Sequence, residues 1–247
     1  MLFSSLNEAV FSLMDLPEEA HVLDIGCRNA GWLTGFMERF PGRISRAIGI
    51  DQRDCEFTDF PLPAGVELCV MDCAAGLDFP DDSFDFVFCK DMLECLANPA
   101  GLVREIYRVL KPGGMVICVN CDWDSVVYNG YDKELIAKAL HAYAIWQQPW
   151  MDELDSWIGR RTYGIFRTSG LFDGAVVVHS VVETTFREGC FGYDFSGHIG
   201  CVAEQGDDLL TKEEYDAFLA DLEKADEEGT YLFSKPYYLY SGTKRTE

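Results

Sequence analysis

The stretch Val22-Leu23-Asp24-Ile25-Gly26-Cys27-Arg28-Asn29-Ala30-Gly31 decides the fold of this chain. It begins as an apolar strand, breaks into a turn with two glycines, and leads into a helical pattern of apolar residues between Trp32 and Phe40. This order places backbone N–H groups and the positive end of a helix beside a ligand. Asp51 ends the next apolar run, where a carboxylate can accept hydrogen bonds from ribose hydroxyls. The stretch therefore predicts a nucleoside-binding α/β fold.

Asp24 indicates which kind of nucleoside ligand this turn accepts. A dinucleotide site requires the pattern G-x-G-x-x-G, whereas here an acid precedes Gly26-Cys27-Arg28-Asn29-Ala30-Gly31. The charge of Asp24 would repel a pyrophosphate and attract a cation. The turn thus favours a nucleoside ligand with a positive charge over a dinucleotide.

Strands and helices alternate on both sides of the turn. Apolar runs typical of buried strands occupy residues 21–25, 47–50, 66–71, 84–89 and 115–119, and Asn98-Pro99 opens a helix before the last of them. The alternation predicts a doubly wound α/β sheet, with residues 20–121 as the ligand-binding core of one domain spanning residues 1–247. Residues 128–170 and 189–229 are predicted to be helical additions on the substrate side. Further strands are expected at 175–186 and 231–240.

The composition narrows the classes of partner. Twenty Lys and Arg against 42 Asp and Glu give a net charge of −22, which repels nucleic acid and anionic membrane surfaces. The first basic residue is Arg28, and no apolar run approaches the roughly 20 residues of a membrane span, so we expect a cytoplasmic protein. The ten cysteines are then reduced thiols. Cys118 and Cys121 have metal-ligand spacing but lack a convincing second pair, so no metal site is expected.

Six motifs follow one another within residues 20–120 in the order and spacing of a known family. They are Val22-Leu23-Asp24-Ile25-Gly26-Cys27, Ile48-Gly49-Ile50-Asp51, Met71-Asp72-Cys73, Leu77-Asp78-Phe79-Pro80-Asp81-Asp82-Ser83-Phe84-Asp85-Phe86-Val87, Asp91-Met92-Leu93-Glu94-Cys95-Leu96 and the run 104–114. Together they resemble the class I S-adenosylmethionine-dependent methyltransferases, in the small-molecule and quinone-type branch with a methyltransferase type 11-like domain. Beyond residue 121 the resemblance is one of general topology.

This resemblance implies a fold, a reaction and a cofactor. The fold would be a Rossmann-like, seven-stranded mixed sheet in the order 3-2-1-4-5-7-6, with the strand at 231–240 antiparallel and helical additions on the C-terminal rim. The reaction would transfer the methyl group of S-adenosyl-L-methionine to O, N or S of a small-molecule acceptor, leaving S-adenosyl-L-homocysteine. Two alternatives stay open: C-methylation of a quinone-like ring, and a non-catalytic module that keeps the cofactor pocket.

The motifs also assign residues to the parts of the cofactor. The turn around Gly26 would hold the methionyl group, Asp51 the ribose, and Asp72 with Cys73 the adenine. The cofactor-binding candidates are Asp24, Gly26, Cys27, Arg28, Asp51, Gln52, Asp72, Cys73 and Cys89. The chain departs from the family at Arg28 and Ala30, where glycines are usual, and at Cys95, where a His is common.

The methyl acceptor is expected over the ends of the fourth and fifth strands, beside the cofactor. The acceptor-side candidates are Glu94, Asp122, Trp123, Asp124 and Tyr128, roofed by the aromatic segment 131–157. An aromatic ring between two acids would suit an amine or a polar aromatic acceptor. The equally open alternative is that Trp123 packs the roof while both acids face water.

Overall fold

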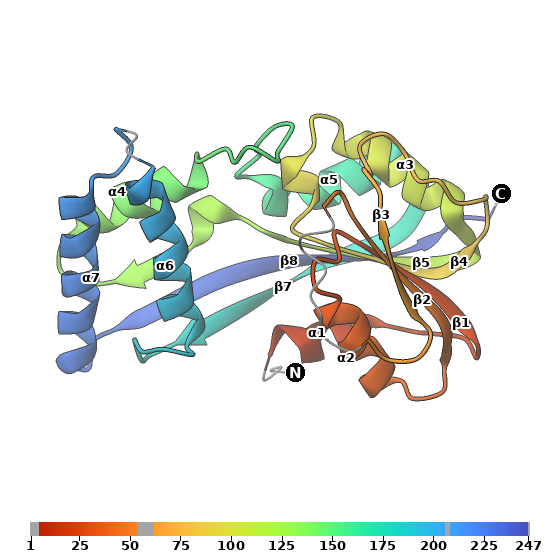
Figure 1. Cartoon of the computed structure of the whole chain (residues 1–247), viewed down its shortest axis with the longest axis horizontal. Coiled ribbons are helices and arrows are strands. Elements are labelled where there is room, and N and C mark those ends of the chain that lie inside the picture. Colours follow the sequence, from red (N-terminus) through yellow and green to blue (C-terminus); the bar gives the residue numbers. More distant parts are fainter. Residues whose placement is uncertain (1–4, 54–61, 206–207, 247) are drawn as a thin grey trace.

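Strands of one mixed β-sheet run the length of the molecule in this computed structural model, which describes residues 5–53, 62–205 and 208–246 (Figure 1). Within those residues the sheet has eight strands: β1 Ala20–Ile25, β2 Ile44–Asp51, β3 Val66–Val70, β4 Phe84–Lys90, β5 Leu110–Cys121, β6 Val127–Asn129, β7 Phe172–Glu183 and β8 Leu232–Lys244. The helices are α1 Leu6–Leu13, α2 Gly31–Arg39, α3 Pro99–Val109, α4 Lys133–Ala144, α5 Ile158–Ser169, α6 Phe191–Glu204 and α7 Lys212–Glu227. Two short 3₁₀ turns, η2 Leu93–Cys95 and η3 Trp123–Ser125, follow β4 and β5.

The predicted strand order is confirmed. Strands β3, β2, β1, β4 and β5 lie side by side and parallel, and β8 pairs antiparallel with β5 on one side and with β7 on the other. One strand was not predicted: β6 pairs with the first residues of β8, in line with the end of β5. Tyr128 therefore lies in a strand, not in the helical segment that the sequence predicts. A three-residue strand is too short to show an alternating pattern, which explains the error.

Alternation along the central strands supplies one apolar core to each face of the sheet. Phe86 and Phe88 of β4 pack in the core that includes residues of α1 and α2, whereas Val87 and Cys89 pack in the core that includes residues of α3 and α5. Figure 1 shows α1 and α2 on one side of the sheet and α3 and α5 on the other. Because β4 is buried on both faces, its register is fixed. A shift by one residue would move Phe86 and Phe88 into the core of Val87 and Cys89, and the reverse.

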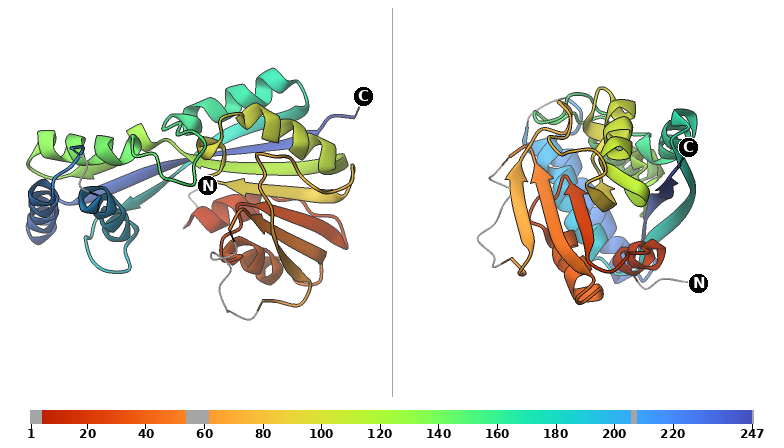
Figure 2. Two further views of the ribbon diagram at one scale, coloured as in Figure 1. Left: turned by 45° about the horizontal axis from the view of Figure 1, so that its top comes forward. Right: turned by 90° about the vertical axis from the view of Figure 1, so that its right-hand side faces the viewer.

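The helices after residue 128 divide between two places. In both figures α4, α6 and α7 gather at the end of the molecule where β8 begins, whereas α5 lies beside α3 on the sheet (Figure 2). Ile158, Thr162 and Phe166 form a buried stripe on α5, and Phe166 stacks on Tyr240 of β8 with 4.0 Å between ring centroids. Helix α5 therefore covers the sheet, unlike the rim position that the sequence suggests for all of 128–170. The capping box of α7, formed by Thr211 and Glu214, is present.

Candidate functional site

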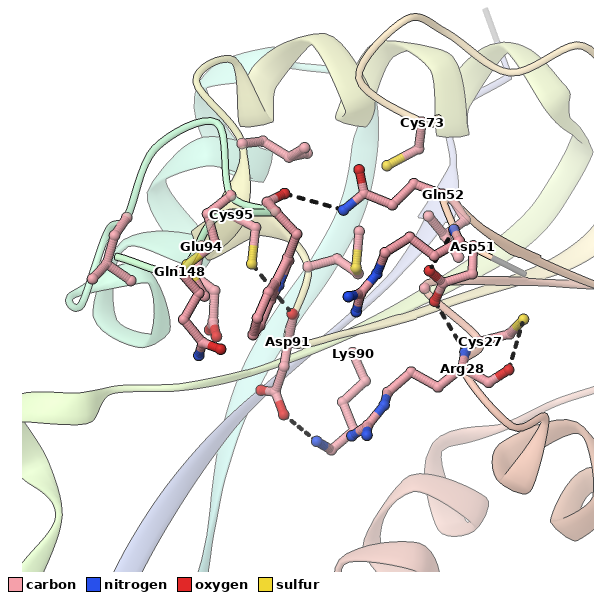
Figure 3. A pocket seen from close by; sticks show the side chains of 18 of the residues that line it. Cys27, Arg28, Asp51, Gln52, Cys73, Lys90, Asp91, Glu94, Cys95 and Gln148 are labelled. Atoms are coloured by element: carbon pink, nitrogen blue, oxygen red, sulfur yellow. Dashed lines mark hydrogen bonds and ion pairs between the residues drawn. The ribbon is translucent and has the colours of Figure 1, made fainter. Parts of the chain in front are cut away.

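A cavity opens at the carboxyl ends of β1, β2 and β4. Its volume of about 850 Å³ is within the roughly 300–1,000 Å³ that is typical of small-molecule sites. Its walls are the turns after these strands, the connection between α4 and α5, and α6. In Figure 3, Cys27, Asp51 and Cys73 lie on one side, and Glu94 and Gln148 lie on the other. The cavity thus brings the predicted cofactor residues and part of the predicted acceptor residues into one space.

The turn after β1 has the backbone form that close approach of a ligand requires. Gly26 has φ +77°, and a Cβ at this position would collide with the side chain of Met92. Arg28 and Ala30 also have positive φ, +45° and +59°, although neither is glycine. A left-handed backbone costs a residue with a Cβ roughly 1–2 kcal/mol. The turn therefore has a left-handed backbone at two positions that are not glycine.

Asp51 ends β2 at the rim of the cavity, as predicted. Its Oδ2 accepts a hydrogen bond from the backbone N–H of Arg28 at 3.1 Å, and its Oδ1 accepts one from the N–H of Arg53 at 3.4 Å. The carboxylate is therefore held in place by backbone on both sides. Since each carboxylate oxygen can accept more than one hydrogen bond, capacity remains for a ligand.

Gln52 connects the cofactor side of the cavity to the segment that covers it. The Gln52 side-chain amide donates to the carbonyl of Trp150 at 3.0 Å, and the guanidinium of Arg53 lies 5.0 Å from the Trp150 ring centroid. The same segment donates the N–H of Asp152 to the carbonyl of Cys95 at 2.9 Å. We call residues 145–157, which connect α4 to α5, the cover segment.

Asp72 and Cys73 follow β3 and line the cavity beside Asp51. The Oδ1 of Asp72 accepts the N–H of Ala74 at 2.9 Å, which closes a tight turn. Burial and the charge of Asp72 raise the pKa of the Cys73 thiol to about 12. Cys73 is therefore a neutral packing group at pH 7, and not a nucleophile.

Two predicted cofactor residues lie beneath the cavity instead of lining it. Asp24 is 1 % exposed and Cys89 is fully buried, and neither is among the lining residues. Burial and the nearby charge of Asp51 raise the pKa of Asp24 to about 8. The Oδ2 of Asp24 has no hydrogen-bond partner within the described part of the chain. Asp24 is thus a buried acid whose negative form is favoured by cations, of which Lys90 is one that the protein itself supplies.

On the acceptor side, Glu94 and Trp123 line the cavity, and Asp122, Asp124 and Tyr128 do not. Asp122 is fully buried and forms a bidentate ion pair with Arg160 of α5. Its Oδ1 also accepts from Ser125 Oγ at 2.8 Å. A buried carboxylate needs such partners, so the site assignment of Asp122 is corrected to a structural one.

The other two acceptor candidates are also engaged elsewhere. Asp124 accepts a hydrogen bond from the indole N–H of Trp157. Tyr128 is 5 % exposed among the rings of Phe195, Phe218 and Phe233, and its hydroxyl donates to a backbone carbonyl of α6. Neither interpretation of the acid–Trp–acid motif is therefore complete: Trp123 faces the cavity, whereas both flanking acids are bound within the protein.

Several lining residues were not predicted. Lys235 and Tyr237 come from β8, and His198 from α6, whereas Tyr143 of α4 belongs to the aromatic segment that the sequence predicts as a roof. Burial and the positive charges of Lys235 and Arg28 lower the pKa of His198, which favours its neutral form. Only Lys235 left a signal in the sequence, because it is a charge on the face of β8 that Phe233, Tyr237 and Leu239 otherwise make apolar.

Charged groups concentrate at the centre of the cavity. Lys90 and Asp91 form an ion pair, and in Figure 3 the side chain of Arg28 reaches toward them. Asp91 has φ +50°, and its Oδ1 also accepts the N–H of Cys121 at 3.3 Å. The ion pair therefore lies between the Asp51 side and the Glu94 side of the cavity.

Comparison with known proteins accounts for this arrangement. The sequence model of a family described as "Methyltransferase domain" matches residues 23–118. A demethylmenaquinone methyltransferase of Listeria welshimeri is 31% identical over 141 residues, which cover 51% of this chain and 57% of that relative. Residues 23–118 are therefore similar to the class I methyltransferases. A demethylmenaquinone methyltransferase of Staphylococcus epidermidis is 27% identical over 192 residues, covering 69% of this chain and 75% of that protein.

Solved structures show the family fold over nearly the whole chain. A protein of Bacillus halodurans, crystallised as a candidate methyltransferase, aligns with a TM-score of 0.64 at 18% identity and covers 98% of this chain and 100% of its own. A [4+2]-cyclase aligns with a TM-score of 0.56 at 18% identity, covering 98% of this chain and 81% of its own. The fold is therefore shared with a protein named for other chemistry, and the activity must be argued from the site. The chain also spans little more than half the length of the Listeria relatives that it matches.

Residues 5–53, 62–205 and 208–246 contain neither a metal-binding cluster nor a membrane-spanning helix. No group of three or more His, Cys, Asp and Glu side chains there is arranged to hold a metal ion. No helix in this part of the chain has both the length and the apolar character needed to cross a bilayer.

Proposed function

We propose that this chain is an S-adenosyl-L-methionine-dependent methyltransferase that acts on a small-molecule acceptor. The observation that carries the proposal is Asp51, a backbone-anchored carboxylate that shares one cavity with a second, aromatic-walled compartment. A reaction between two bound molecules requires such adjacent compartments, because the reacting atoms must be aligned at about 3–3.5 Å. The demethylmenaquinone methyltransferases to which the chain is similar support the same reaction class.

The residues present fit the cofactor. Asp51 accepts hydrogen bonds from the ribose hydroxyls, and Asp72 with Cys73 borders the adenine. The turn from Gly26 to Arg28 holds the methionyl group, since Gly26 lets the backbone approach where a side chain would collide with Met92. The unpartnered oxygen of Asp24 beneath this turn fits a ligand with a sulfonium and an ammonium group, because a nearby cation stabilises its charged form.

When bound, the cofactor supplies a methyl group on a positively charged sulfur, and S-adenosyl-L-homocysteine is left as product. The protein aligns the acceptor with this group and excludes water. The cover segment excludes the water, because Gln52 and Cys95 hold it over the cavity from two sides. Trp123, Glu94 and Lys235 then surround the acceptor, and a general base is required only for acceptors that are protonated at neutral pH.

A second candidate function is C-methylation of a quinone-like ring. Trp123, Tyr143 and Phe195 pack against one another at the acceptor side, with centroid distances of 4.9–5.8 Å. Flat aromatic walls suit a flat acceptor. The relatives named demethylmenaquinone methyltransferase agree with this alternative. A non-catalytic module that keeps the cofactor pocket is the third possibility.

We propose a small-molecule partner, and neither nucleic acid nor an anionic membrane surface, because the net charge of −22 disfavours both. The cellular compartment that we propose is the cytoplasm. Calorimetry with S-adenosylmethionine tests the cofactor site first. Absence of binding at millimolar cofactor would contradict both enzyme proposals. Transfer of label from methyl-labelled cofactor to a panel of phenols, amines, thiols and reduced quinones then distinguishes O-, N-, S- and C-methylation. Binding without transfer to any of them would favour the non-catalytic module.

A further inference from the structure

Lys235 is a buried cation that faces the acceptor side of the cavity. Its side chain is 4 % exposed and occupies an inward position of β8 between Phe233 and Tyr237. Its ammonium lies 4.0 Å from the ring centroid of Trp123, and 5.0–5.2 Å from those of Phe191, Phe195 and Tyr237. Four aromatic faces therefore surround one charge.

Within the part of the chain that the structure describes, no anion lies at bonding distance from this ammonium. Among the described residues, Lys235 has neither a hydrogen bond nor an ion pair, whereas Lys90 nearby is paired with Asp91. Burial is the largest influence on the pKa of Lys235, and it lowers it. Aromatic faces compensate a buried cation only in part, since a cation–π contact is weaker than the hydration that burial removes. An anionic ligand in the cavity would complete the compensation.

Glu94 adds a second buried polar group to the same compartment. It is 4 % exposed, and its Oε2 has no hydrogen-bond partner within the described residues. Burial and the nearby charge of Asp91 raise the pKa of Glu94 to about 8, against the opposing influence of Lys235 and Lys90. Burial thus favours the protonated form of Glu94, whose carboxyl group can donate a hydrogen bond where an ionised one only accepts.

We infer that Lys235 and Glu94 together bind an anionic oxygen, a carboxylate or a phenolate, on a flat aromatic methyl acceptor. The inference rests on the proposed function and deepens it by naming the class of acceptor. The rings around Lys235 provide flat apolar walls, and the two donors fix the orientation of the acceptor's charged edge. An amine acceptor, which the acid–Trp–acid motif suggested, does not fit, because Asp122 and Asp124 are bound to Arg160 and Trp157.

Binding of naphthalene probes tests the inference. With S-adenosyl-L-homocysteine present, calorimetry compares 2-naphthoate, the neutral 2-naphthamide and the cationic 2-naphthylmethylamine on the wild-type chain. We expect 2-naphthoate to bind at least tenfold more tightly than the amide, and the amine to bind most weakly. A fourth probe, 2-naphthol, separates the two sources of anionic oxygen: appearance of its ionised absorption band on binding assigns a phenolate, and its absence with naphthoate binding intact assigns a carboxylate.

Lys235→Met tests the residue itself, because Met keeps the length and apolar stem without the charge. In this variant the preference for naphthoate over the amide should fall to within twofold, with affinity for S-adenosyl-L-homocysteine unchanged. Lys138→Met is the matched control, since Lys138 is paired with Glu214 between α4 and α7 and does not line the cavity. A thermal melt shows whether each variant is folded, and the wild-type probe series stands alone if K235M is not.

Several results overturn the inference. They are equal binding of naphthoate and naphthamide by the wild type, a preference for the amine, a preference retained in K235M, or no binding of any probe while S-adenosyl-L-homocysteine binds. Failure of S-adenosyl-L-homocysteine itself to bind is a different result, which contradicts the proposed function.

Discussion

Replacing Asp51 by Asn changes one charge at the rim of the cavity and almost nothing of its shape. In the native chain the carboxylate accepts the N–H of Arg28 at 3.1 Å through one oxygen and the N–H of Arg53 at 3.4 Å through the other. The variant keeps a single accepting oxygen, and its amide nitrogen must face a donor. A ligand that uses both oxygens of Asp51 therefore loses one charge-assisted hydrogen bond and retains the other.

The expected loss of cofactor affinity follows from the free energy that this hydrogen bond contributes. A hydrogen bond to a charged group contributes about 1.5–3 kcal/mol. Because about 1.4 kcal/mol corresponds to a factor of ten, Asp51→Asn should weaken S-adenosylmethionine binding roughly ten- to a hundredfold. Asp51→Ala, which removes both oxygens, should weaken it at least as much.

Isothermal titration calorimetry with the cofactor measures this effect, and Asp85→Asn is the control. The nearest acid along the chain, Asp54, lies outside the described residues. Asp85 also accepts a backbone amide, the N–H of His21 at 2.8 Å, and pairs with Lys111 at 2.7 Å, but it lies near the amino end of β4. Its replacement should lower stability and leave cofactor affinity unchanged. Equal affinities of Asp51→Asn and wild type would show that Asp51 only holds the loop, and the ribose assignment would be wrong.

Three further predictions concern the residues beneath and over the cavity. Asp122→Ala should lower the free energy of unfolding, measured in urea, by about 1–3 kcal/mol, and should leave cofactor affinity unchanged. This range is kept low because the Arg160 side chain is 39% exposed and solvent screens the ion pair. A variant as stable as the wild type would contradict the structural role. Gln52→Ala should speed cofactor dissociation about three- to tenfold in stopped-flow experiments, because the variant loses the hydrogen bond to the Trp150 carbonyl, which contributes about 0.5–1.5 kcal/mol. An unchanged dissociation rate would show that the cover segment is not a barrier to the cofactor. The pKa of Asp24 is raised to about 8, so the folded chain holds a proton that the unfolded chain releases near pH 4. The stability of the ligand-free chain should therefore fall as the pH rises from about 4 to about 8, by up to about 1.4 kcal/mol per pH unit. Asp24→Asn should remove this component in melts across that range, and identical pH profiles would refute the assignment.

Local pattern predicted the sheet because each central strand is buried on both faces. A run such as 84–89, apolar on successive residues, can satisfy two cores only as a strand covered by helices, and β4 spans Phe84–Lys90. Asp51 and Gly26 could be placed at the cavity for a related reason. Parallel strands end at the same edge of the sheet, so the residues that follow them meet there wherever they lie in the sequence.

The acceptor side followed no such rule. Asp122 directly follows β5 as predicted, yet Arg160 of α5 neutralises it, because that helix packs on the sheet beside α3. Nothing within the local sequence of either residue indicates the pairing. At Arg28 and Ala30 the sequence lacks the usual glycines, yet both residues adopt the left-handed backbone that glycine normally provides.

The sequence by itself therefore determined the parallel strands and the edge of the sheet at which Gly26 and Asp51 meet, since short-range periodicity and the geometry of parallel strands dictate both. The strand order followed from the resemblance to the class I methyltransferases. Only the tertiary structure decided which groups meet on the acceptor side. Lys235 reaches the compartment of Glu94 because β8 runs antiparallel beside β5, so that the first residues of β8 lie at the carboxyl edge of the sheet. Contacts of this kind depend on how whole elements pack. The burial of Lys235, and that of Glu94, whose Oε2 has no hydrogen-bond partner among the described residues, exists only after that packing.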